Sequence, residues 1–507
     1  MLRLSEPQLD RSLASIQAHG HGSFFPKPPE FQVVISQWEG IRKELADIDL
    51  DTYAGYSSCQ MFAPKSKLNI RRVDQLHPYD LILYTALALE LQNSITASRI
   101  PPDENRVFSY RTEGVTPNQL YTPTPSFPDF RRRARELAEE KARYFGLTDI
   151  GDFFPRIYHH RLINALQSAS RNTKADEIRC LEKMLYRFSG GTSYGIPIGP
   201  PASRLFGEAI LIDVDSTLIS KGIDFLRFVD DYVIVADRAE DAEYGIRELA
   251  EVLYLNHGLT LQTAKTKLTT SEGYLSLTQG YENKEAAHRE LIDLTGGYDD
   301  EPTPYEDLSA EEKKAIDALN LSGMLEEALQ NGEQIDYQEV SFILSRLSSL
   351  REPDLIPAVL DNIEKLFPVA HAVARFFGAF DALDDRVRRD VTNRLLLPIE
   401  TSQHVSEYYA VWILSLFFDK QDWNNAPRLA RIFSTTQSDA VQRFAALALA
   451  TSGTRAEALT AMRSFRGAVP LLRSAILFAS KNLGRDERKY TMKSLQLENL
   501  LERTLAA

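Results

Sequence analysis

Two adjacent aspartates, Asp230 and Asp231, lie inside an otherwise apolar run. The run Phe225–Ala236 reads FLRFVDDYVIVA, with aromatic and β-branched residues on both sides of the acids. This pattern predicts a β-hairpin with the acids at its turn. Adjacent buried carboxylates repel each other unless a cation neutralises them, so one solution is a turn that presents both to a divalent metal ion. A solvent-facing turn is the alternative, and this segment alone favours it.

A third acid lies upstream, in the segment TDIGDFF. We expect Leu147–Phe154 to be a strand with Asp149 near its start. A carboxylate on a neighbouring strand would complete a two-metal site for nucleotidyl transfer. Phe154, five positions further on, would then stand where a ribose 2′-hydroxyl clashes and so select deoxynucleotides. A core aromatic is the simpler alternative for Phe154.

Two further segments fit the same chemistry. The loop GIPIGPPASR contains Gly199 and leads into a helix that Pro200 and Pro201 would begin; its glycines allow the backbone to approach a nucleotide or template. The segment NHGLTLQTAKTK ends a helix expected over 240–256 with Gly258 as its stop. It places Lys265 where it could neutralise or protonate a departing pyrophosphate. An ordinary turn and a solvated lysine are the alternatives.

Taken in chain order, the segments that contain Asp149, Gly199, Asp230 and Lys265 resemble motifs A, B, C and D of reverse transcriptases, over about residues 60–275. Upstream, Arg71, Arg72 and the segment Val107–Arg111 are similar to the fingers motifs, whose basic side chains meet the incoming triphosphate. The resemblance implies a polymerase with dNTPs as substrates. It also implies Mg²⁺ or Mn²⁺ as the cofactor. The implied site residues fall into three groups: the metal-binding and catalytic Asp149, Asp230 and Asp231, the catalytic Lys265, and the dNTP-binding Arg71, Arg72, Phe154 and Gly199.

The version of motif B, Gly-Ile-Pro-Ile-Gly-Pro-x-x-Ser-Arg-Leu, narrows the resemblance. With an α-helical region after it, the chain is similar to the abortive-infection (Abi) reverse transcriptases, and most to those of P2-type prophages. That family implies untemplated DNA synthesis primed from a tyrosine of the protein, bacterial defence against phage, and a homo-oligomer. The expected product is single-stranded DNA, covalently attached to the chain. Ile198 replaces the glutamine usual before the motif B glycine, which puts ordinary template handling in doubt.

The priming residue has no motif of its own. Tyr53 and Tyr56 lie in a polar N-terminal stretch and are candidates among 21 tyrosines.

The fold class we expect is an α+β reverse-transcriptase-like fingers and palm followed by an all-α domain of HEAT-like repeats. Beyond residue 337, amphipathic helices rich in alanine and leucine recur at a period on the order of 40 residues. The expected domains are an N-terminal extension (1–60), the fingers and palm (61–295), an acidic linker or insertion (296–336) and the repeat domain (337–507). The acidic run Asp299–Glu301 has no catalytic role in this scheme.

The composition limits which kinds of partner the chain can bind. The formal net charge is −13, which argues against tight, sequence-blind duplex binding by the whole surface but not against a locally basic channel. No apolar run reaches the length of a membrane span, and two cysteines are too few for a disulfide framework. We therefore expect a cytosolic protein that contacts no membrane, and the resemblance implies a bacterial one.

Three functions remain open. The first is the protein-primed, template-independent polymerase of an anti-phage system. The second is an RNA-templated reverse transcriptase of a bacterial defence system. The third is a non-enzymatic helical scaffold with a vestigial palm, against which the intact Asp149, Asp230, Asp231 and Lys265 argue.

Overall fold

The computed structural model describes residues 2–507 apart from 67–68, 117, 280–308, 311–312, 315–320, 331–334, 352, 381–382, 403, 421 and 424. The expected acidic linker lies largely outside the described residues, and Asp299–Glu301 does so entirely. The chain divides into two units that alternate along the sequence. Unit 1 comprises Met1–Ser23, Gln37–Ser58 and Asp74–Asn283, and unit 2 comprises Phe24–Ser36, Cys59–Val73 and Lys284–Ala507. This division into two units does not test the expected domain boundaries, which remain predictions.

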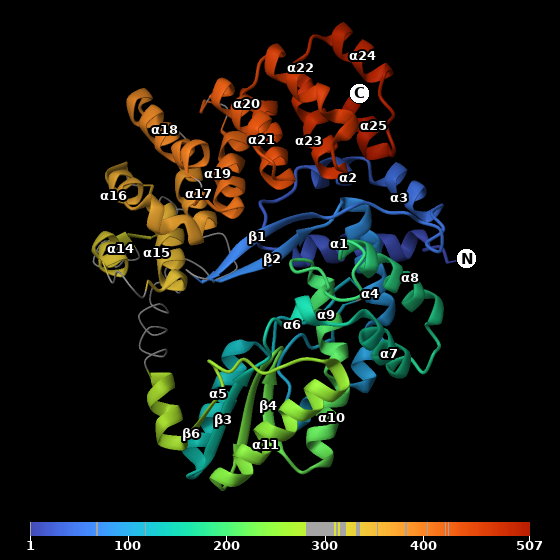
Figure 1. The fold of residues 1–507 in the computed structure, drawn as a ribbon, viewed down its shortest axis with the longest axis vertical. Helices are drawn as coiled ribbons and strands as arrows, with labels where there is room; N and C mark the ends of the chain where they lie inside the picture. Colours follow the sequence, from blue (N-terminus) through green and yellow to red (C-terminus); the bar gives the residue numbers. More distant parts are fainter. Residues whose placement is uncertain are drawn as a thin grey trace. The chain divides into compact units, whose positions relative to one another are not determined.

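Unit 1 is built on a four-stranded antiparallel sheet (Figure 1). Its strand order is β4 (Asp224–Phe228), β5 (Asp231–Ala236), β3 (Tyr144–Asp149) and β6 (Lys267–Thr270). The predicted hairpin is confirmed: β4 and β5 pair antiparallel, with Phe228 opposite Asp231. In the neighbouring pair, Asp149 lies opposite Asp231. The central strands therefore bring two of the three predicted acids into register at one end of the sheet.

The expected strand Leu147–Phe154 is wrong in its bounds. Strand β3 begins earlier and ends at Asp149, and Asp152, with φ +48°, turns the chain into the short helix α6 (Phe153–Arg156). Gly146 lies inside this strand, where a Cβ atom would stand 2.7 Å from Cδ1 of Ile246. The glycine is required because helix α11 (Ala239–Val252) packs closely on this face.

Helices cover both faces of the sheet. On one face, α5 (Phe127–Glu140) packs Phe130 and Ala134 against Phe145 and Val233. On the other, Gly245 of α11 lies so close to the sheet that a Cβ would stand 2.6 Å from Cγ2 of Ile234. The predicted helix end is confirmed: α11 continues as the π-helical turn η2 (Leu253–His257), and Gly258 follows in the left-handed conformation.

The rest of unit 1 packs around one long buried helix, α4 (Pro78–Ser98). Four helices contact it directly: α1 (Glu6–His19), α7 (His159–Ala169), α8 (Ala175–Phe188) and α9 (Pro201–Ile210). The prediction that Pro200 and Pro201 begin a helix is confirmed, with Pro201 in the first turn of α9. Helix α10 (Ile212–Ser220) follows α9, and α3 (Trp38–Ala46) contacts α1.

In unit 2, every described element from Leu321 onward is helical, so the predicted all-helical C-terminal region is confirmed. One row of helices consists of α15 (Tyr337–Leu350), α17 (Ala370–Gly378), α19 (Glu407–Asp419), α21 (Asp439–Ser452), α23 (Pro470–Ala479) and α25 (Leu500–Ala506), each contacting the next. A second row consists of α16 (Ile356–Asp361), α18 (Asp385–Thr401), α20 (Ala426–Thr435) and α22 (Arg455–Arg463). The helices α14 (Leu321–Gln330) and α24 (Arg485–Lys493) complete the set. The HEAT-like assignment stays a prediction.

N-terminal segments complete this unit. Strands β1 (Cys59–Ser66) and β2 (Asn69–Gln75) form a two-stranded sheet, and β1 contacts α19 and α21. Helix α2 (Glu30–Ser36) is held by a fully buried ion pair, 2.7 Å long, between Glu30 and Arg443. The indole Nε1 of Trp412 also donates to the carbonyl of Phe24.

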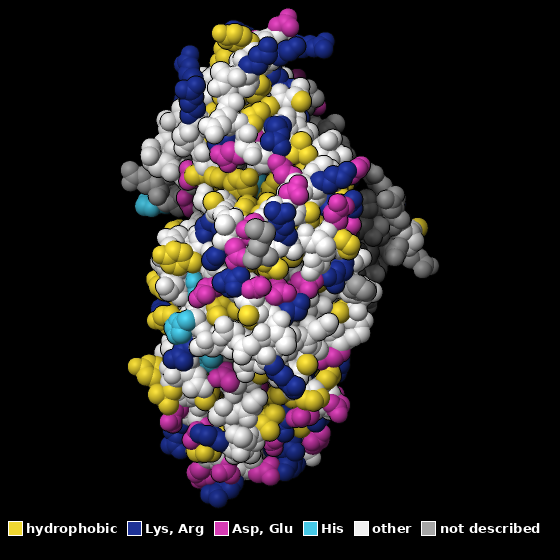
Figure 2. Space-filling view, turned by 90° about the vertical axis from the view of Figure 1, so that its right-hand side faces the viewer, with side chains coloured by type: hydrophobic (Ala, Val, Ile, Leu, Met, Phe, Trp, Pro, Cys, Tyr) yellow, Lys and Arg dark blue, Asp and Glu magenta, His cyan; other side chains and the backbone are white. Residues whose placement is uncertain are grey.

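None of the described helices is both long and apolar enough to span a membrane. On the face that Figure 2 shows, basic and acidic side chains alternate, and no large patch of one sign forms there.

Candidate active site

Asp149, Asp230 and Asp231 meet where β3 and β4 end and β5 begins. Asp149 is the last residue of β3, Asp231 is the first of β5, and Asp230 lies in the two-residue turn before it. The Asp230 carbonyl accepts a hydrogen bond of 3.1 Å from the amide of Ile150, which ties the turn to the end of β3. The structure therefore brings together the three acids that the sequence singled out.

The motif D segment lies against the same end of the sheet. The amide of Gln262 donates to the carbonyl of Asp149 at 2.7 Å, and the amide of Gly151 donates to the carbonyl of Thr260 at 2.8 Å. These bonds bring the ammonium of Lys265 onto the Asp149 carboxylate, with which it forms an ion pair. Lys265 thus stands with the aspartates.

The electrostatics of the acids reflect their crowding. Burial, reinforced by the charges of Asp149 and Asp231, raises the pKa of Asp230 to about 7. Burial and the charge of Asp149 raise the pKa of Asp231 to about 6. Burial alone would lower the pKa of Lys265, but its hydrogen bond to Asp149 and the nearby carboxylates outweigh burial and raise it. The cluster therefore carries an excess of negative charge that one lysine does not balance.

The donor set fits a hard divalent cation. Oδ1 of Asp149 is buried and has no hydrogen-bond partner among the described residues, and such an atom needs a proton donor or a metal ion. The other oxygen of this carboxylate, Oδ2, forms the ion pair with Lys265. Within the part of the chain that the structure describes, no three His, Cys, Asp or Glu side chains are already placed as a metal-binding group. The metal-binding role of the three acids stays a prediction.

The turn that presents Asp230 is strained and firmly held. Val229 has φ +56°, a conformation that a β-branched residue rarely adopts. Its amide donates to Oγ of Ser109 at 2.9 Å, and its carbonyl accepts from Nη1 of Arg227 at 3.0 Å. These two contacts determine where the Asp230 carboxyl lies.

A buried network of charges stands behind this turn. The guanidinium of Arg227, fully buried, pairs with Asp215 at 2.6 Å and with Glu208 at 3.0 Å. Glu208 also pairs with Arg99 at 2.7 Å and accepts a hydrogen bond from Ser109 at 2.6 Å. Sequence reasoning missed these positioning residues. The signal available was Arg227, a charged residue in an apolar strand, three positions before Asp230.

Phe154 lies in α6 rather than on a strand. A Cβ on Gly207 of α9 would stand 3.0 Å from Cε1 of Phe154, so the ring packs directly on that helix. The Phe154 carbonyl accepts from the amide of Ile196, in the motif B loop. The ring is half-buried and its role in sugar selection stays a prediction.

Gly199 is enclosed by backbone. Its φ is +133°, and an added Cβ would stand 3.0 Å from the carbonyl oxygen of Asp74. A Cβ on Gly22 would stand 2.9 Å from the carbonyl oxygen of Gly199. The amide of Asp74 donates to the carbonyl of Ile198 at 2.9 Å. The loop is thus packed from two sides by other parts of unit 1.

The remaining predicted residues are two arginines and two tyrosines. Arg71 and Arg72 are on β2 in unit 2, and the Arg71 guanidinium lies 5.5 Å from the Phe24 ring centroid. The dNTP-binding role of both arginines stays a prediction. The ring of Tyr56 stacks on His77 at 3.9 Å. The hydroxyl of Tyr53 is buried, and burial with the charge of Asp80 raises the pKa of Tyr53 strongly. A buried phenol is poorly placed to accept a nucleotide, but both priming assignments stay predictions.

Comparison of the chain with known protein families identifies the class of protein. Residues 87–304 match the family model described as reverse transcriptase (RNA-dependent DNA polymerase). The chain therefore contains a reverse transcriptase domain, which indicates a nucleic-acid polymerase of reverse-transcriptase type. No curated protein matches the chain.

Among solved structures, the chain is similar to telomerases at low identity. The apo telomerase of Candida tropicalis is 12% identical over 82% of this chain and 74% of its own, with a TM-score of 0.33. The telomerase of Candida albicans in complex with the TWJ fragment of telomeric RNA is 10% identical over 76% and 69%, also at 0.33. A C-terminally truncated C. tropicalis structure is matched over 42% of this chain and half of its own length, at 12% identity and a TM-score of 0.33. The class of protein is therefore assigned from the family match alone, because TM-scores of 0.33 are too low to support an assignment.

Proposed function

We propose that this chain is a DNA nucleotidyltransferase of reverse-transcriptase type that uses two divalent metal ions. The observation that carries the proposal is the meeting of Asp149, Asp230 and Asp231 at the ends of paired strands, with Lys265 against them. Bound Mg²⁺ or Mn²⁺ would activate the attacking hydroxyl and stabilise the leaving pyrophosphate. The three aspartates would hold the metal, and Lys265 would give a proton to the leaving group or neutralise it.

The proposal extends to synthesis without a template, primed by a tyrosine of the chain. The resemblance to Abi reverse transcriptases supports it, as does Ile198 in place of the usual glutamine. The backbone contacts of Gly199 with Gly22 and Asp74 add support, because they leave no room for a base against those two sides of the glycine. The anti-phage role and the homo-oligomer rest on the same resemblance.

The test is the incorporation of labelled dNTPs by the purified full-length chain with Mg²⁺ and no added nucleic acid. We expect radioactivity to stay with the protein through denaturing electrophoresis and to disappear in Asp230→Asn. An unlabelled protein band from a preparation that extends an added primer would overturn the priming proposal. Mass spectrometry of the intact protein would show covalent DNA directly.

The second candidate is an RNA-templated reverse transcriptase. The printed description of the matching family, RNA-dependent DNA polymerase, favours it. It predicts that synthesis depends on an added RNA template with primer, and that the product is complementary to the template. Product sequencing separates the candidates, since untemplated synthesis gives a sequence that does not follow the template.

A further inference from the structure

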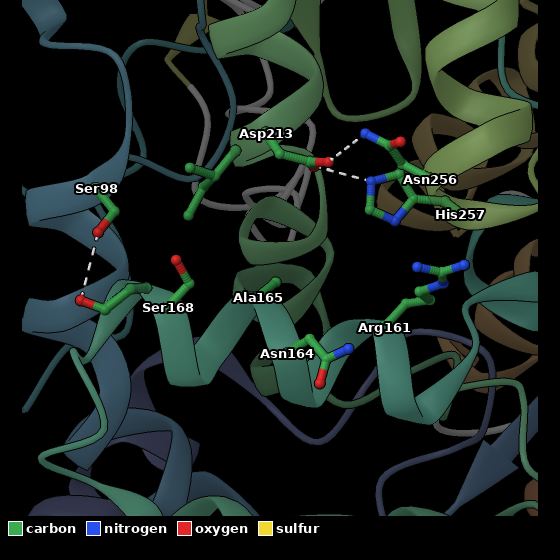
Figure 3. A pocket seen from close by; sticks show the side chains of 10 residues that line it. Ser98, Arg161, Asn164, Ala165, Ser168, Asp213, Asn256 and His257 are labelled. Carbon is green, nitrogen blue, oxygen red and sulfur yellow. Dashed lines mark hydrogen bonds and ion pairs between the residues drawn. The ribbon is translucent and has the colours of Figure 1, made fainter.

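A cavity of about 280 Å³ lies in unit 1, and neither the three aspartates nor Lys265 line it (Figure 3). Its walls come from four segments that are far apart in the sequence: the end of α4, one face of α7, the start of α10 and the end of η2. This volume is at the lower end of the range for ligand pockets, which suits a small molecule and not a nucleic-acid strand.

One wall is a polar stripe on α7. Arg161, Asn164, Ala165 and Ser168 all line the cavity, and their spacing of three, four and seven residues puts them on one helix face. In Figure 3 the Arg161 guanidinium lies beneath the His257 ring. Within the described part of the chain, this guanidinium has no hydrogen bond or ion pair. It is therefore a cation available to a ligand.

The opposite wall is an ordered group of three polar side chains. Nε2 of His257 lies 2.8 Å from Oδ1 of Asp213, and Nδ2 of Asn256 donates to Oδ2 at 2.9 Å. Both oxygens of Asp213 are thus engaged within the protein. Burial alone would raise the pKa of Asp213, but the hydrogen bonds from His257 and Asn256 lower it, so this carboxylate stays charged and accepts both bonds.

This pairing leaves one buried nitrogen without a partner. Because a carboxylate can only accept, Nε2 of His257 carries the hydrogen of this bond, and in the neutral form of the ring Nδ1 is the nitrogen with the free lone pair. Nδ1 is buried without a hydrogen-bond partner among the described residues, in a side chain only 6% exposed. Buried polar atoms are normally satisfied, and this one belongs to a residue that lines the cavity.

We infer that this cavity binds a small phosphomonoester that also carries hydroxyl groups, of the sugar phosphate or nucleoside monophosphate class. The Arg161 fork matches phosphate oxygens, and Asn164 and Ser168 add neutral hydrogen-bonding groups beside it. Nδ1 of His257 accepts from a ligand hydroxyl. Asp213 keeps its negative charge, but both of its oxygens are turned toward His257 and Asn256 (Figure 3). The inference does not depend on the proposed polymerase activity.

The experiment is isothermal titration calorimetry of the full-length protein in a phosphate-free buffer with EDTA, which removes any metal-dependent binding at the aspartates. The probes are ribose 5-phosphate, adenosine 5′-monophosphate, inorganic phosphate and ribose. We expect one site for the two phosphomonoesters and weaker binding of ribose and of inorganic phosphate. Tighter binding of adenosine monophosphate than of ribose 5-phosphate identifies a nucleotide site, and the reverse identifies a sugar phosphate site.

Two variants tie the binding to this cavity. Arg161→Gln removes the exposed cation without touching the core, and should weaken phosphomonoester binding roughly tenfold or more. Asn164→Asp places a negative charge on the same wall and should weaken it as well. Arg171→Gln, an exposed arginine just beyond α7 that does not line the cavity, is the matched control and should bind normally.

Failure of both phosphomonoesters to bind would overturn the inference. So would binding that Arg161→Gln and Asn164→Asp leave unchanged, or ribose binding as tightly as its phosphate. None of these three results bears on nucleotide transfer, because no metal is present in these titrations.

Discussion

At the Asp230 carboxyl, burial and two neighbouring acids act in the same direction, and Lys265 compensates only in part. Such a cluster is costly to the fold when no cation is bound, and it becomes favourable when one binds. The placement of these side chains therefore favours a role in chemistry over a role in stability. We therefore expect changes of these individual residues to affect activity.

Asp149→Asn and Asp230→Asn should each lower nucleotide incorporation by about a hundredfold or more, because each removes a charge that would hold the metal ion. Initial rates with labelled dNTPs measure this. Asp237→Asn, an exposed acid just beyond the other end of β5, is the control. Equal activity of Asp230→Asn and the unmutated chain would refute the assignment of the site.

The metal-free protein should become less stable as pH rises, because two of its carboxyl groups have raised pKa values. The pKa of Asp230 is raised from 3.8 to about 7 and that of Asp231 to about 6, so the folded chain binds more protons than the unfolded chain in this window. The free energy of unfolding of the metal-free protein should therefore fall as pH rises from about 4 to about 7.

Urea unfolding of unit 1 in EDTA, at pH 5 and pH 8, measures this effect. Asp230→Asn should be more stable than the unmutated chain at pH 8, and the difference should shrink at pH 5. Asp237→Asn should show no such gain. A loss of stability in Asp230→Asn at pH 8 would mean that the carboxylate is well compensated in the metal-free fold.

Phe154 offers a test of sugar selection. If its ring stands where a 2′-hydroxyl would clash, Phe154→Ala should raise ribonucleotide incorporation relative to deoxynucleotide incorporation. The ratio of kcat/KM for paired dNTP and rNTP substrates measures this, with Phe153→Leu, which alters the adjacent buried ring, as the comparison. An unchanged ratio would leave Phe154 as a packing residue on Gly207.

At the scale of elements, the catalytic turn depends on partners from several helices. Arg227 of β4 joins Glu208 of α9 and Asp215 of α10, and through Val229 it supports the strained turn. All three side chains are almost completely buried. The network ties the helices that follow motif B to the hairpin of motif C.

Arg227→Leu should destabilise unit 1 by about 3–5 kcal/mol, because it leaves the buried Asp215 without its cation and Glu208 with Arg99 alone. Equilibrium urea unfolding measures the loss. Arg238→Leu, which removes an exposed arginine just beyond β5, should cost less than about 1 kcal/mol. A small effect of Arg227→Leu would show that Arg99 can neutralise Glu208 and Asp215 alone.

At the scale of the whole molecule, the chain crosses between its two units more than once. Residues 24–36 and 59–73 belong with the C-terminal helices, although residues on both sides of them belong to unit 1. The ion pair between Glu30 and Arg443 joins residues 413 positions apart. The helical unit is therefore incomplete without N-terminal segments.

Glu30→Gln should destabilise the helical unit by about 3–5 kcal/mol, since Arg443 would keep a buried charge without a counter-charge. Limited proteolysis of the C-terminal helices and urea unfolding both detect this loss. Glu39→Gln, on the exposed side of α3, is the control and should change little. Resistance of Glu30→Gln to proteolysis equal to that of the unmutated chain would show that α2 is not needed by this unit.

Local pattern determined several elements in advance. The apolar run around Asp230 specified the hairpin, Gly258 marked a helix end, and Pro201 marked a helix start, because each depends on periodicity or on one residue's own backbone preference. The order of the four motifs was enough to single out three acids and Lys265. The strand expected at Leu147–Phe154 was misplaced because its start depends on packing: Gly146 lies inside β3, where it admits α11.

Tertiary structure alone decided the rest. No local signal shows that Glu208, Asp215 and Arg227 form a single buried network, or that Gly22 packs on Gly199, since these contacts join distant segments. The same holds for the cavity between α7 and His257 and for the crossing of residues 24–36 into the helical unit. The sequence by itself determined which side chains can do chemistry; the packing of distant segments determined which of them are buried, paired and brought together.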